Sequence, residues 1–171
     1  ACDVGSRYLQ AAVHRVTRGA FEQAENQVNA LSHDALTASR TLDDAVRQYL
    51  SESSGPLDAR APVVRASNRA IRLRAAADLI ADIVPPPLGV YPQAREVLER
   101  HTAAVCARLD GTDPTASLPP ISDALVPALR AEAGAGDLAV SAALPLVTAA
   151  ANIGELELTY PPALAAEPAP T

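Results

Sequence analysis

Three arginines spaced by four and by three residues offer the most distinctive chemistry in this sequence. Arg65, Arg69 and Arg72 lie within a segment whose pattern predicts a helix. A turn of 100° per residue places all three on one face, within about 60° of one another. Guanidinium groups bind carboxylates and phosphates through paired hydrogen bonds, so this arginine stripe predicts contact with anions.

The stripe has no carboxylate three or four residues away in its own segment, so its anionic partners must come from elsewhere. One source is the preceding helix, where Asp43, Asp44 and Glu52 could form an internal network. The other is a bound ligand. Leu79 and Ile83 continue the same face, which favours a molecule with an acidic head and an apolar body, such as an aromatic acid or an acyl-CoA-like thioester. Both sources remain open at this stage.

Residues of opposite charge also recur four positions apart, and this spacing predicts ion pairs within a helix. The expected structural pairs are Arg40–Asp44, Asp43–Arg47 and Arg74–Asp78. Carboxylates paired in this way stay ionised, which is the opposite of what a general acid needs.

The helix that carries the stripe is expected at the centre of a bundle, because apolar residues flank the arginines on both sides. One flank holds Leu73, Ala77 and Ile80, and the other holds Val64, Ile71 and Ala75. A helix that is apolar on two sides is usually buried on both.

The whole chain of 171 residues predicts an all-α bundle of five to six mostly antiparallel helices. It is rich in Ala and Leu and poor in strand formers, with one Phe, four Tyr and no Trp or Met. Apolar periodicity, prolines and glycines set the expected bounds. The expected helices cover residues 3–32, 34–52, 62–84, 92–110, 121–133 and 137–158, with Asp34 and Asp137 as N-caps and a kink at Pro145.

Several classes of function are disfavoured by composition and spacing. All 14 basic residues are arginine, yet the net charge is −6 and the pI is about 5.0, so a nucleic-acid binder is not expected. His14, His33 and His101 lack metal-ligand spacing, and Cys2 and Cys106 do not form a disulfide framework. We expect His101 to be a packed, hydrogen-bonded core residue, and no catalytic residue, metal or cofactor is expected.

The two ends of the chain suggest a domain cut from a longer protein. Residue 1 is alanine, and charges within residues 1–30 interrupt any secretory signal. The uncharged stretch 138–154 is diluted by polar residues and alanine, so it predicts a core helix and no membrane span. We expect a soluble helical domain over residues 1–160 and a flexible Pro/Ala-rich tail over 161–171.

Three segments of the first half resemble one family of membrane proteins. The runs SRTLDDAVRQYLSE at 39–52, IRLRAAADL at 71–79 and TRGAFEQA at 17–24 resemble the cytoplasmic part of actinobacterial fusaric acid resistance (FUSC) or aromatic acid exporter-like proteins. The resemblance covers about residues 6–84. It implies a domain at the cytoplasmic face of the bacterial inner membrane, with its own transmembrane domain as a partner.

The resemblance and the stripe together lead to one favoured function and two alternatives. The favoured function is sensing of an amphipathic organic anion, or organisation of the subunits, for an exporter-like protein. The first alternative is a purely structural domain that forms a homo-oligomer. The second is a self-contained helical bundle that binds acyl-CoA or lipid.

Overall fold

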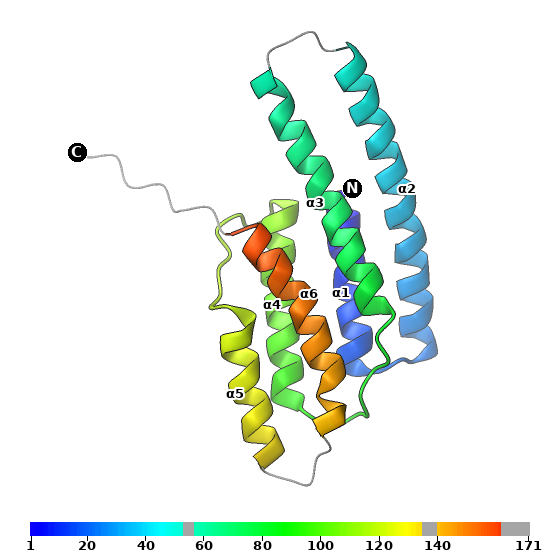
Figure 1. Ribbon diagram of the computed structural model, residues 1–171. Coiled ribbons are helices and arrows are strands. Elements are labelled where there is room, and N and C mark those ends of the chain that lie inside the picture. Colours follow the sequence, from blue (N-terminus) through cyan, green and yellow to red (C-terminus); the bar gives the residue numbers. More distant parts are fainter. Residues whose placement is uncertain (53–56, 135–139, 162–171) are drawn as a thin grey trace, which may run out of the picture.

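The computed structural model describes residues 1–52, 57–134 and 140–161, and this part of the chain contains helices and their connections without any strand (Figure 1). The all-α prediction is confirmed. The elements are α1 (Cys2–Arg18), α2 (Glu22–Glu52), α3 (Leu57–Ala81), α4 (Pro92–Asp110), α5 (Ile121–Gly134), the short 3-10 helix η1 (Val140–Ala142) and α6 (Leu144–Thr159).

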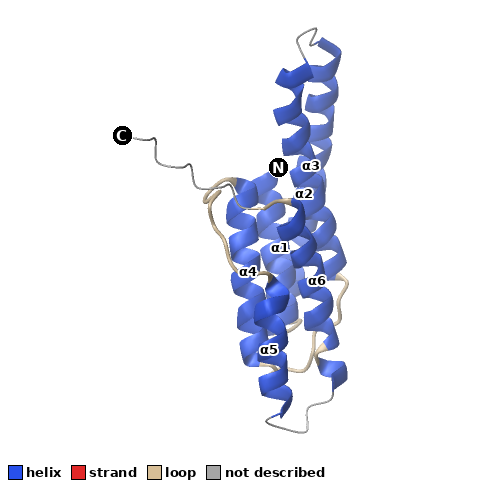
Figure 2. Ribbon diagram, turned by 60° about the vertical axis from the view of Figure 1, so that its left-hand side comes forward, coloured by secondary structure: helices blue, strands red, loops and turns tan. Residues whose placement is uncertain are grey.

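Helix α1 lies at the centre of the bundle and packs against α2, α3, α4 and α6. Its face Leu9, Val13 and Val16 is fully buried and forms much of the core. The contact with α3 is close because Gly5 has no side chain: a Cβ there would lie 3.1 Å from Leu73 Cβ. Helix α5 packs against α4 and α6 on the other side of the molecule (Figures 1 and 2).

The prediction of one helix over residues 3–32 is wrong, because the chain reverses direction at Gly19. This residue has φ 100° and ψ 158°, a conformation that glycine adopts more readily than other residues. The helical spacing of buried apolar residues resumes after the break, since Val13 and Val16 of α1 and Val28 of α2 are buried while Ala20 between the helices is exposed. Periodicity reports which face is buried and carries no information on chain direction. The predicted cap Asp34 lies inside α2 and is exposed.

Most later helix ends follow their prolines and glycines. Pro92 stands in the first turn of α4 and Gly111 ends that helix with φ 87°, as expected. Helix α3 starts before the predicted residue 62 and contains Pro62. The predicted kink at Pro145 is wrong: α6 begins at Leu144, so this proline occupies the first turn, where its missing N–H breaks no bond.

Two expected features lie outside the described residues. These are the N-cap at Asp137 and, beyond residue 161, the C-terminal tail.

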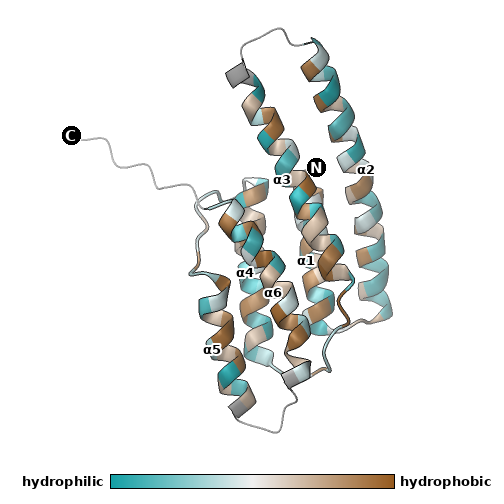
Figure 3. Cartoon of the chain, viewed as in Figure 1, coloured by the Kyte–Doolittle hydropathy of each residue, from teal (hydrophilic) through white to brown (hydrophobic). Residues whose placement is uncertain are grey.

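Helices α2 and α3 form a hairpin that projects beyond the rest of the bundle (Figures 1 and 2). Helix α2 has 31 residues, which corresponds to about 46 Å, whereas α1 has 17. Helix α2 packs on α1 and α3, and Val28 and Ala35 are its buried apolar residues. Hydrophilic colours predominate on α2, and hydrophobic colours on α6 (Figure 3).

The base of this hairpin is fastened by Arg95, which is buried on α4. Its guanidinium donates to the carbonyl oxygen of Thr17, just before the α1–α2 turn, and to that of Pro87, at 2.7 Å, in the connector after α3. Nε donates to the Val90 carbonyl at 2.6 Å. Burial lowers the pKa of this guanidinium, and the carbonyl acceptors replace the water it has lost.

Candidate functional site

The arginine stripe lies on an exposed face of α3, so the expectation of a buried central helix is wrong. Arg65, Arg69 and Arg72 are all exposed. Helix α3 packs one flank, Leu73, Ala77 and Ile80, against the core. It leaves Val64 and Ile71, on the other flank, at 40% and 39% exposure. Helix α3 therefore buries only one of its two apolar flanks.

Among the described residues, the stripe contacts α6 and Tyr160, which follows it, and does not contact α2. Arg72 Nη1 lies 3.6 Å from Glu155 Oε1, and both side chains are at least half exposed. The Arg69 guanidinium lies 5.9 Å from the centroid of the Tyr160 ring. Arg65 has no charged or hydrogen-bonding partner among the described residues. The proposed network with Asp43, Asp44 and Glu52 does not form.

Leu79 and Ile83 were expected to continue the face of the stripe, and the first of them is also exposed. Leu79 is 59% exposed, and Ile83 is partly buried against the core. An acidic molecule lying along the stripe would therefore leave much of its apolar body in water.

Of the predicted ion pairs, one forms. Arg74 Nη1 lies 3.8 Å from Asp78 Oδ2, and Asp78 also accepts a 2.9 Å hydrogen bond from the Tyr8 hydroxyl. The pairs Arg40–Asp44 and Asp43–Arg47 are wrong: within the described ranges none of these four side chains has an ionic partner within 4 Å. Exposed pairs of this kind gain little energy, because water solvates each charge separately.

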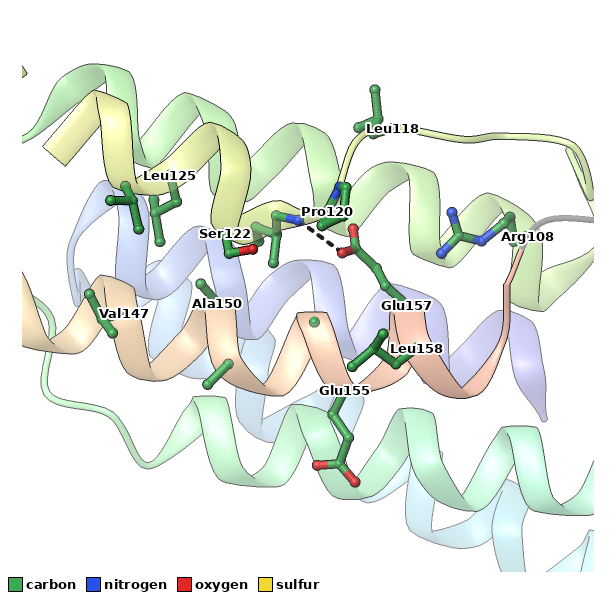
Figure 4. Close-up of a pocket in the computed structure, with 14 residues that line it drawn as sticks. Arg108, Leu118, Pro120, Ser122, Leu125, Val147, Ala150, Glu155, Glu157 and Leu158 are labelled. Atoms are coloured by element: carbon green, nitrogen blue, oxygen red, sulfur yellow. Dashed lines mark hydrogen bonds between the residues drawn. The ribbon is translucent and has the colours of Figure 1, made fainter.

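A pocket of about 600 Å³ lies between α5, α6 and the end of α4 (Figure 4). Its walls are mostly aliphatic. Leu118, Pro120, Ile121, Leu125 and Val126 line one side, and Val147, Ala150, Ala151, Gly154 and Leu158 of α6 line the other. This size and lining are typical of sites for small molecules with a large apolar part.

Arg108 supplies the cation of this pocket and was not singled out from the sequence. The residue is 8% exposed, and its Nη1 donates to the Ala116 carbonyl at 2.9 Å. Its Nε is buried and has no hydrogen-bond partner among the described residues, and no carboxylate lies within 4 Å of the guanidinium. Figure 4 shows the guanidinium at one end of the pocket, directed along it.

Glu157 lines the pocket beside Arg108 but is already engaged on the core side. Its Oε1 lies 2.8 Å from His101 Nδ1, and its Oε2 accepts a 3.1 Å hydrogen bond from the backbone N–H of Ile121 (Figure 4). One carboxylate thus joins α4, α6 and the first residue of α5. His101 is 1% exposed, so the prediction of a packed, hydrogen-bonded histidine is confirmed.

The buried thiol of Cys106 does not supply a nucleophile in this region. Cys106 is fully buried, and burial raises its pKa to about 12. Its Sγ lies 3.6 Å from the carbonyl oxygen of Ser6. A thiol in this environment stays protonated and unreactive at neutral pH. Within the described ranges, no group of three His, Cys, Asp or Glu side chains is arranged to hold a metal ion.

Within the same ranges, none of the helices combines the length and apolar character that a membrane crossing requires. Comparison of the chain with protein-family models, with curated proteins and with solved structures found no match.

Proposed function

We propose that this chain is a ligand-binding helical bundle whose α5–α6 pocket takes an amphipathic organic anion. The hydrocarbon part packs against the aliphatic walls, and the acidic group accepts hydrogen bonds from Arg108. The observation that carries the proposal is a nearly buried guanidinium with an unpartnered Nε at the end of an apolar pocket. It favours the self-contained acid- or lipid-binding bundle over binding at the exposed stripe.

The energetic reason is the cost of a buried charge. A guanidinium taken from water loses several kcal/mol of hydration unless hydrogen bonds or a counter-charge replace it. One carbonyl bond, to Ala116, replaces part of that hydration for Arg108. An incoming carboxylate would supply the counter-charge and accept hydrogen bonds from the outer guanidinium nitrogens, and a charge-assisted hydrogen bond of this kind contributes about 1.5–3 kcal/mol.

The test is calorimetric titration of the purified chain with decanoate. We expect the Arg108→Gln variant to bind at least about tenfold more weakly, because about 1.5 kcal/mol or more of charge-assisted bonding is lost. Arg65→Gln is the matched control and should bind as tightly as the unmodified chain, since Arg65 lies on the exposed stripe. Equal affinities of Arg108→Gln and the unmodified chain would overturn the proposal.

A second candidate function is subunit organisation, and the projecting α2–α3 hairpin favours it (Figure 2). Beyond the end of α1 the two helices have exposed apolar side chains, among them Leu50 and Val64. Native mass spectrometry distinguishes the two functions, because it reports the number of subunits and any retained small molecule together. A monomer that carries an acid favours ligand binding, and an empty oligomer favours organisation.

The exporter context is a separate proposal that rests on the resemblance of residues 6–84. In this proposal the domain lies at the cytoplasmic face of the bacterial inner membrane and reports the presence of an organic acid to its own transmembrane part. The sequence of the complete gene tests it: membrane-spanning segments joined to this domain are the expected result. A gene that encodes no such segment would contradict the exporter context and leave the ligand proposal unchanged.

A further inference from the structure

The lining of the α5–α6 pocket is informative about the shape of its ligand. The apolar part of the lining consists of Leu, Ile, Val, Ala, Pro and Gly residues, and in the part of the chain that the structure describes no aromatic ring lines this pocket. A planar ring acid would therefore meet no partner for stacked or edge-to-face packing. Methylene groups pack well against branched aliphatic side chains, so the walls suit a flexible chain.

The pocket also has a direction, and it follows helix α6. Arg108 and Leu158 stand at one end, and Val147 and Leu125 stand at the other (Figure 4). Val147 and Leu158 are eleven positions apart on α6, which corresponds to about 16 Å at 1.5 Å per residue. A charged group at Arg108 thus leaves a long apolar path behind it, beside α6.

Small residues of α6 line this path. Ala150, Ala151 and Gly154 share the lining face, at positions i, i+1 and i+4. A glycine inside a helix is destabilising relative to alanine, because it loses more backbone entropy on folding. A Cβ at Gly154 would lie 3.3 Å from Ile121 Cγ2, so this glycine lets the first residue of α5 pack directly on α6 and leaves no space for a methyl group between them.

We infer that the ligand is a single-chain aliphatic acid, with its carboxylate at Arg108 and its chain running along α6 past Gly154 toward Val147. Gly154 and Ala151 then set the chain length that the pocket accepts. This inference rests on the proposed function, since it specifies the class of anion that the same pocket takes.

The experiment compares hexanoate, decanoate and naphthoate by calorimetric titration. In the unmodified chain each methylene that reaches an aliphatic wall should tighten binding by up to about fourfold, so decanoate should bind much more tightly than hexanoate. Naphthoate has the same acidic group on a rigid ring system and should bind more weakly than decanoate.

The decisive variant is Ala151→Phe, which fills the path halfway along α6. Ala151 is exposed, so the larger side chain can be accommodated without disturbing the core. We expect this variant to lose at least about tenfold in affinity for decanoate while hexanoate binding changes less than about threefold. Thr148→Phe is the matched control, with the same bulk on the same helix at an exposed position that does not line the pocket.

The outcomes separate this inference from the proposed function. If acids bind through Arg108 but naphthoate competes equally with decanoate, or Ala151→Phe weakens both straight-chain acids alike, the chain-length inference is overturned and the anion site stands. If none of the three acids binds, the proposed function itself fails. Circular dichroism of each variant confirms that the helices are retained.

Discussion

The arginines of the exposed stripe on α3 and Arg108 in the pocket between α5 and α6 lie in opposite environments. On α3, Arg65 and Arg72 stand in water, and the ion pair of Arg72 with Glu155 is exposed on both sides. At the pocket, Arg108 is nearly buried and contacts a single carbonyl among the described residues. The buried arginine needs an anionic or hydrogen-bonding partner more than the three aligned, exposed arginines do. Burial removes the hydration of a charge, whereas alignment on one face leaves that hydration in place.

Carboxylates two positions apart on α6 repeat this contrast. Glu157 is mostly buried and accepts a hydrogen bond from a backbone N–H while contacting His101, whereas Glu155, which also lines the pocket, is 72% exposed. The two residues have the same chemistry on the same helix. Comparing variants of the two residues measures what burial of a carboxylate contributes to the free energy of unfolding.

The largest expected effect on stability is that of Glu157→Ala. The change leaves the His101 ring and the Ile121 N–H without their acceptor in a buried setting, so we expect a loss of about 2–4 kcal/mol in the free energy of unfolding. Urea denaturation followed by circular dichroism measures it. Glu155→Ala is the matched control and should change stability by less than about 0.5 kcal/mol. Equal losses in the two variants would contradict the contrast between them.

An intermediate effect is expected at Glu99, which is paired at the boundary between core and solvent. Arg18 Nη2 lies 2.8 Å from Glu99 Oε2, and the Thr17 hydroxyl donates to Oε1 at 2.6 Å. The pKa of Glu99 is lowered, chiefly because its carboxylate accepts hydrogen bonds from Arg18. We expect Glu99→Gln to cost about 1 kcal/mol at neutral pH.

The pH dependence of this effect has a defined sign. A carboxyl with a lowered folded-state pKa stabilises the fold above its unfolded-state pKa, which is about 4.3 for glutamate, and this contribution is lost as the pH falls through the folded-state value. The unmodified chain should therefore lose stability below about pH 4 more steeply than Glu99→Gln. Denaturation curves at several pH values provide the measurement. If the stability of the unmodified chain and of Glu99→Gln falls equally steeply in acid, the prediction is wrong.

The smallest effects belong to the stripe. Arg65→Gln, Arg69→Gln and Arg72→Gln should each change the free energy of unfolding by less than about 0.5 kcal/mol, because exposed charges keep their hydration when a partner is removed. Thermal or urea unfolding of the three variants provides the check. A loss above about 2 kcal/mol in any of them would mean that the stripe is covered, for instance by a second subunit.

The sequence was sufficient for the fold class and for those helix ends that have their own local signal. Pro92 and Gly111 delimit α4 as expected, because a proline in the first turn and a glycine after the last act within a few residues. The reversal at Gly19 was missed, since the helical pattern of buried positions continues across it. Pro145 was misread because its effect depends on where the helix begins, and that was not evident from the pattern.

The candidate site was harder to predict, because its environment is made by distant segments. His101 was correctly expected in the core from its place between Leu98 and Val105. Arg108 also has apolar neighbours in α4, but its burial depends on the loop after α4, whose Ala116 carbonyl it contacts, and on α6. The stripe was misassigned because a helix pattern does not tell which of two apolar flanks another helix will cover.

The clamp at Arg95 has a mechanical consequence for the projecting hairpin. One guanidinium holds the chain just before α2 begins and again just after α3 ends, so both legs of the hairpin are attached to α4 through the same side chain. A force on the far end of the hairpin would therefore be transmitted to α4 at Arg95, four residues before Glu99. The neutral carbonyls that form the pivot do not titrate, so its stiffness should persist across a wide range of acidity.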